Sequence, residues 1–116
     1  MIKKIFLAAI VGVIICAGVK AEAREIFVGN SPATGHACYV LTDTIYRTEE
    51  ERMVIYSATL KTVNSYGREY FIDYKFFSLD GDTEDVQFTN SEGYKGMVTE
   101  YDTPIEWAMF LTVREY

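Results

Sequence analysis

His36 and Cys38 are the two side chains of this sequence best suited to chemistry. They stand two residues apart in the stretch SPATGHACYVLTD, residues 31–43, and His36 is the only histidine of the chain. Residues two apart on a strand project from the same face, so the imidazole and the thiol could meet as base and nucleophile. A zinc site needs three or four ligands, which carboxylates or a second chain would have to complete. The spacing favours a histidine at a strand entrance beside a buried cysteine, and a thiol or metal protein is the alternative.

A second candidate is the acidic stretch DGDTED, residues 80–85, whose carboxylates could bind calcium. An EF-hand loop that starts at Asp80 would need glycine at its sixth position and glutamate at its twelfth. This chain has Asp85 and Ser91 there. The stretch is therefore predicted to be a solvated turn between two strands.

No other motif points to catalysis. The sequence contains no serine elbow, no phosphate-binding loop and no HExxH pattern. We therefore predict a protein that is not an enzyme, with no catalytic residues, no cofactor and no metal. The tyrosines offer a different kind of site, because tyrosine is enriched at protein interfaces. Tyr66 and Tyr94 fall in predicted turns, so we expect both to be exposed and to contact a partner.

The first 23 residues have the pattern of a secretory signal peptide. Lys3 and Lys4 precede fifteen uncharged residues, 5–19, and Ala21 and Ala23 occupy the −3 and −1 positions of a cleavage site. The uncharged run is shorter than the ~20 apolar residues of a membrane anchor. Lipid attachment at Cys16 is an open alternative. We expect residues 1–23 to be removed and residues 24–116 to form one small exported domain, in the periplasm, on the cell surface or secreted.

The remaining 93 residues carry eight basic and sixteen acidic side chains, a net charge of −8. This charge opposes binding to nucleic acid, and no second apolar run favours membrane insertion after cleavage. Cys38 is then the only cysteine, so it is either free or paired between chains. The oligomeric state stays open.

Alternating apolar and polar residues predict an antiparallel sheet. A brief edge strand is expected at residues 26–28, further strands at 37–43, 53–64 and 69–79, a short one around residues 86–88 and a last one at 97–101. The polar stretch RTEEER, residues 47–52, is predicted to reverse the chain. In the strand at 53–64, Val54, Tyr56, Ala58 and Leu60 share the predicted covered face, and Ser57, Thr59 and Lys61 share the wetter one.

The final segment, DTPIEWAMFLTVREY, predicts a helix. Thr103 is expected to be the N-cap, Pro104 the first helical residue, and Glu106 the third, which is the order of a capping box. Ile105, Ala108, Met109 and Thr112 follow the helical period, and Trp107, Phe110 and Leu111 widen the apolar stripe. The predicted fold class is α+β: an antiparallel sheet of about five or six strands with one C-terminal helix packed on one face.

Residues 37–79 resemble the surface-adhesin protein E family of bacteria. The similarity follows the segment CYVLTDTIYR, through Tyr39, Val40, Asp43, Thr44, Ile45 and Arg47, and continues through the strands MVIYSATLKTVN and YFIDYKFF. The resemblance implies a sheet with a C-terminal helix on its concave side and a non-enzymatic protein-binding role, with a host or envelope protein as partner. A periplasmic structural or accessory protein is the alternative.

Overall fold

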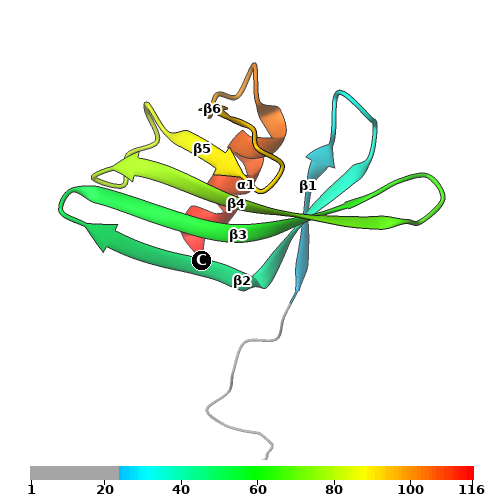
Figure 1. Ribbon diagram of the computed structural model, residues 1–116, viewed down its shortest axis with the longest axis horizontal. Coiled ribbons are helices and arrows are strands. Elements are labelled where there is room, and N and C mark those ends of the chain that lie inside the picture. Colours follow the sequence, from blue (N-terminus) through cyan, green and yellow to red (C-terminus); the bar gives the residue numbers. More distant parts are fainter. Residues whose placement is uncertain (1–23) are drawn as a thin grey trace, which may run out of the picture.

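The computed structural model describes residues 24–116, so the predicted signal peptide and Cys16 lie outside the described residues. The elements in chain order are β1 (Glu25–Asn30), β2 (Ala37–Glu50), β3 (Met53–Val63), β4 (Glu69–Leu79), β5 (Gln87–Asn90), β6 (Lys95–Met97) and α1 (Pro104–Glu115). Over these residues the six strands form one sheet in the order β1-β2-β3-β4-β5-β6, and every pair is antiparallel. The sheet curls, and α1 lies against one of its faces (Figure 1). The α+β class predicted from the sequence is confirmed.

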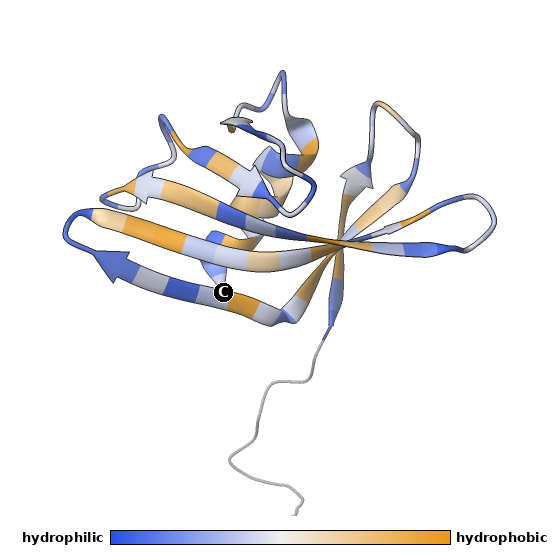
Figure 2. Ribbon diagram, in the orientation of Figure 1, coloured by the Kyte–Doolittle hydropathy of each residue, from blue (hydrophilic) through white to orange (hydrophobic). Residues whose placement is uncertain are grey.

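The face that α1 covers, here called the inner face, holds the core. Hydrophobic and hydrophilic segments are mixed along the long strands (Figure 2), and the alternation is seen in the burial of β3, whose set Val54, Tyr56, Ala58 and Leu60 points inward as predicted. Phe110 of α1 packs its ring against those of Tyr56 and Phe76, at 5.6 Å between centroids in both pairs. The buried residues of the helix are Ile105, Met109, Phe110 and Val113, rather than the expected set with Ala108 and Thr112.

Strand β2 is longer than the sequence pattern indicates. The stretch predicted to reverse the chain continues the strand to Glu50, and the turn to β3 is made by Glu51 and Arg52. A bulge between Leu41 and Tyr46 makes this possible. There the Thr44 hydroxyl donates to the Leu41 carbonyl and accepts the Thr59 N–H, so a side chain stands in for a ladder hydrogen bond. The polar pattern of residues 47–52 does not show that a side chain will replace a hydrogen bond of the strand ladder in this way.

Lys61 was predicted on the wetter outer face and is in fact buried, with 8% of its surface exposed. Its ammonium lies 2.7 Å from Glu25 and 3.5 Å from Glu69, and 5.3 Å from the centre of the Tyr39 ring. These partners come from three different strands, which the strand register brings to the same end of the outer face. The lysine is therefore covered by cross-strand neighbours that its own strand does not predict.

The last strand and the helix start also differ in detail from expectation. Strand β6 is Lys95–Met97, and Val98 already lies in the loop to α1, where its N–H donates to the Val86 carbonyl. Thr103 does precede the helix, but its side chain makes no cap hydrogen bond. Its hydroxyl instead accepts the Thr99 N–H at 2.8 Å and reaches the Thr99 carbonyl at 3.1 Å. The capping box predicted for Thr103 and Glu106 is thus wrong, and Thr103 holds the preceding loop.

Replacing Thr103 with alanine should lower the free energy of unfolding by about 1 kcal/mol, because the partly buried Thr99 amide loses its acceptor. Thr103→Ser keeps the hydroxyl and should stay within about 0.5 kcal/mol of the unchanged chain. Urea unfolding followed by circular dichroism measures both. Equal destabilisation by serine and alanine would show that the methyl group, rather than the hydroxyl, matters at this position.

Candidate functional site: a cleft on the inner face

A cleft of about 700 Å³ lies on the inner face. Phe110 of the helix packs on Tyr56 and Phe76, and the cleft lies over the part of this face that carries Leu60, Tyr70 and Ile72. The walls are the β1–β2 loop, the β5–β6 hairpin and the segment that leads into α1. The residues that line it are Ser31, Pro32, Ala33, Thr34, His36, Cys38, Leu60, Thr62, Tyr70, Ile72, Tyr74, Phe88, Asn90, Glu92, Tyr94, Lys95, Asp102, Thr103, Pro104, Ile105 and Glu106.

The floor is apolar and the rim is aromatic. Leu60 and Ile72 form part of the floor, and Tyr70 and Tyr94 are exposed at its edges. Ligand sites in proteins commonly combine a concave apolar surface with a few fixed polar groups. The fixed polar group here is Glu106, whose carboxylate accepts a 2.7 Å hydrogen bond from the Tyr74 hydroxyl. Burial, with a further contribution from the Glu106 carboxylate, raises the pKa of Tyr74, so its hydroxyl stays protonated as a donor.

His36 and Cys38 line this same cleft, as their spacing allowed, but they do not form a pair. The Cys38 thiol donates to the main-chain carbonyl of His36, 3.5 Å away, rather than to the imidazole. The imidazole stacks on the Tyr70 ring at 6.3 Å between centroids and 8° between planes. Burial, and to a smaller extent the charge of Glu106, raises the pKa of Cys38, although a backbone contact from Ser31 opposes this. A nucleophilic cysteine needs the opposite shift.

We therefore expect Cys38 to react slowly with iodoacetamide in the folded protein. Only 1% of its surface is exposed, and the raised pKa leaves little thiolate at pH 8. Its alkylation should be at least about tenfold slower than in urea, as followed by mass spectrometry of the peptide that contains Cys38. Rapid alkylation of the folded protein near neutral pH would instead support the thiol hypothesis.

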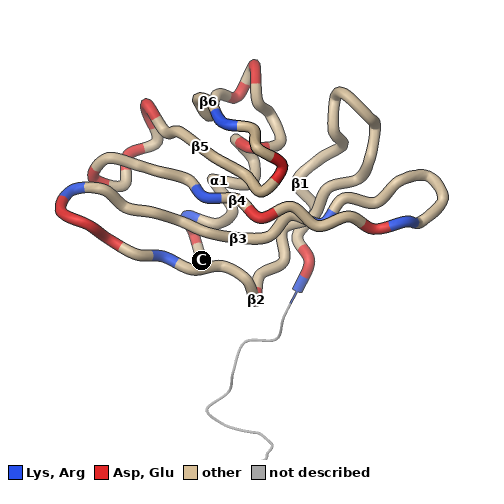
Figure 3. The backbone as a smooth tube through the Cα atoms, in the orientation of Figure 1, with Lys and Arg blue, Asp and Glu red and all other residues tan. Residues whose placement is uncertain are grey.

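Residues 80–85 form the predicted turn after β4, and one of its four acidic side chains has a protein partner among the described residues. Asp80 pairs with Arg52 of the neighbouring β2–β3 turn, and this guanidinium holds the pKa of Asp80 below its ordinary value. Figure 3 shows acidic residues gathered at these two turns. Between residues 24 and 116, no group of three or more histidine, cysteine or acidic side chains is placed to hold a metal ion.

Tyr66 and Tyr94, predicted as partner contacts, are both exposed, but only Tyr94 lines the cleft. Tyr66 lies in the β3–β4 turn, outside the cleft lining. Sequence reasoning did not select Tyr70, Tyr74 or Glu106 as site residues, and it assigned the glutamate to a capping box. Tyr74 lines the cleft as a buried core residue, whereas Tyr70 is exposed. The helix residues that share the cleft with Tyr70 are the first turn of α1, a proximity that no local pattern encodes.

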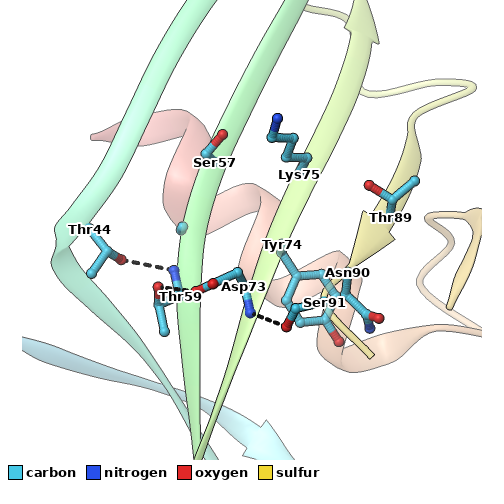
Figure 4. Close-up of a pocket in the computed structure, with 10 residues that line it drawn as sticks. Thr44, Ser57, Thr59, Asp73, Tyr74, Lys75, Thr89, Asn90 and Ser91 are labelled. Carbon is cyan, nitrogen blue, oxygen red and sulfur yellow. Dashed lines mark hydrogen bonds between the residues drawn. The ribbon is translucent and has the colours of Figure 1, made fainter. Parts of the chain in front are cut away.

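A second, shallower groove of about 420 Å³ lies on the outer face (Figure 4). Asp73 accepts a hydrogen bond from the Thr59 hydroxyl, and its own N–H donates to Ser91. Thr44 accepts the Thr59 N–H in the same row. These bonds join β2 to the loop after β5 and occupy the side chains of Thr44, Thr59 and Asp73 within the groove, so we regard the inner cleft as the stronger candidate.

No helix within residues 24–116 is long and apolar enough to cross a membrane. A scan against protein-family models, a search of curated proteins and a search of solved structures each found no match to this chain.

Proposed function

We propose that this chain is an exported, non-enzymatic module that binds another protein through the inner-face cleft. The observation that supports it best is the combination of an apolar floor with exposed tyrosines at the rim. Tyrosine gives a large contact area at a low entropy cost, and exposed aromatic residues around a hollow are typical of protein contacts. The raised pKa and burial of Cys38 speak against a thiol nucleophile in the same cleft.

The partner is proposed to be a host or envelope protein. The signal-peptide pattern of residues 1–23 and the resemblance of residues 37–79 to the surface-adhesin protein E family support an exported location and an adhesin-like role. An accessory role inside the bacterial envelope is the alternative, and it would use the same cleft with a different partner.

Site-specific photocrosslinking tests this proposal. The photoreactive residue p-benzoylphenylalanine is placed at position 94, or at position 46 as the control. Tyr46 matches Tyr94 in residue type and exposure, 64% against 67%, but pairs with Ser57 on the opposite face of the sheet. Each chain is incubated with bacterial envelope proteins and, separately, with host plasma and matrix proteins.

Position 94 should give a discrete crosslinked product that excess unlabelled protein suppresses, and position 46 should not. The preparation that yields the product distinguishes an adhesin-like from an accessory role. Equal labelling from both positions, or none from either, would argue against a binding cleft.

A further inference from the structure

The charge inside the cleft is unbalanced. Its lining contains three carboxylates, Glu92, Asp102 and Glu106, and one ammonium, Lys95. Among residues 24–116 none of these four makes an ion pair. A half-enclosed space with an excess of unpaired negative charge favours a positively charged occupant.

Glu106 is the carboxylate of this group that the fold holds in place. A glutamate at the third helical position commonly reaches back to the N–H of the cap residue. Here the Thr103 N–H donates to the Thr99 carbonyl, and Glu106 turns toward the sheet to meet Tyr74. Tyr74 is buried and its hydroxyl fixes one carboxylate oxygen, Oε2, so the other oxygen is left without a hydrogen-bond partner among the described residues.

The start of α1 explains how the free protein tolerates this charge. The helix N-terminus carries a partial positive charge that stabilises an acidic side chain in the first turn. A partner that brings a cation would add a charge-assisted hydrogen bond to the unoccupied oxygen.

The other features of the cleft also suit one class of partner side chain. These features are the apolar floor and the two exposed tyrosines at the rim, Tyr70 and Tyr94. Arginine and lysine join an apolar stem to a cationic head, and arginine also stacks well on aromatic rings. We propose that the cleft accepts a basic side chain of the partner protein, arginine by preference, with Glu106 as its counter-ion and Tyr74 as the residue that positions Glu106. This inference rests on the proposed protein-binding function.

Two capped tripeptides test the inference: acetyl-Gly-Arg-Gly-amide and its neutral isostere, acetyl-Gly-citrulline-Gly-amide. Each is titrated into the ¹⁵N-labelled protein, and chemical-shift changes are followed by NMR. The arginine peptide should shift the backbone amides of cleft residues and bind at least about fivefold more tightly than the citrulline peptide, since hydrogen bonds to charged groups are the stronger ones. The preference should weaken as salt is added.

Glu106→Gln is the matched variant, because a carboxamide oxygen can still accept the Tyr74 hydrogen bond. It should weaken arginine-peptide binding about tenfold and leave citrulline-peptide binding unchanged. Glu100→Gln, which removes the same charge outside the cleft lining, should stay within about twofold. If Glu106→Gln does not fold, the comparison of the two peptides on the unchanged protein still tests whether the cleft prefers a basic side chain.

Equal binding of both peptides in the cleft would overturn the basic-side-chain inference and leave protein binding intact. Binding of neither peptide would also overturn it, and crosslinking from position 94 would then show separately whether the protein-binding proposal survives.

Discussion

Phe110→Ala is expected to lower the free energy of unfolding by about 3–5 kcal/mol, because the truncated side chain leaves a cavity in the centre of the core. The Phe110 ring is fully buried and contacts Tyr56 of β3 and Phe76 of β4 together. Residues 24–116 contain one cysteine and so no disulfide among themselves, and a fold of this size has little stability to spare, so a loss of this size is a large part of the total.

Urea unfolding monitored by tryptophan fluorescence and by circular dichroism measures the Phe110→Ala effect. Tyr101→Ala provides the control, because Tyr101 is 93% exposed in the loop before α1 and its loss should cost less than about 0.5 kcal/mol. A loss below about 1 kcal/mol at position 110 would mean that the helix does not pack on the aromatic face of the sheet.

Gly29→Ala is expected to cost about 2–3 kcal/mol, because alanine meets both backbone strain and a close contact there. Gly29 lies at the bulge of β1 with φ of +130°, a conformation that residues with a side chain rarely adopt. An added Cβ would lie 3.2 Å from Cδ1 of Ile105 in the first turn of α1. The glycine therefore lets the edge strand and the helix approach each other.

Two comparisons separate the causes at Gly29. Gly35→Ala also places alanine at a positive φ, +76°, but with no atom within 4 Å of the new Cβ, so it reports strain alone. Ile105→Val removes the contacting Cδ1, and in that background Gly29→Ala should cost less. The same cost in both backgrounds would show that the contact with the helix plays no part.

Most of the fold could be predicted from the sequence, because the main signals of its strands and helix are local. Alternation along β3 and β4 and the Thr-Pro start of α1 identify the elements and the covered face, and the structure agrees on each. The sequence patterns gave wrong predictions where the structure depends on a contact partner that is distant in the sequence. The Thr44 hydroxyl extends β2 by bonding to β3, and Lys61 is buried by charges from β1 and β4.

The cleft was harder to predict for the same reason. His36 and Cys38 were identified by residue type and do lie in it, but their side chains make separate contacts that the spacing does not reveal. Glu106 has the sequence position of a capping residue, and only the arrival of Tyr74 from β4 gives it another partner. A hydrogen bond between residues 32 positions apart leaves no periodic trace in the sequence.

The order of the strands also fixes the order in which the molecule can assemble. Each strand pairs with the one that precedes it, and the long hairpins close through short turns, at Glu51 and Arg52 and at residues 64–68. Such local pairings form early, since closing a short loop costs little entropy. Helix α1 alone must return across the sheet to reach β1, β2 and β3. Until the C-terminal residues have been synthesised, the growing sheet therefore has an uncovered aromatic face, which makes the incomplete chain prone to aggregate during that interval.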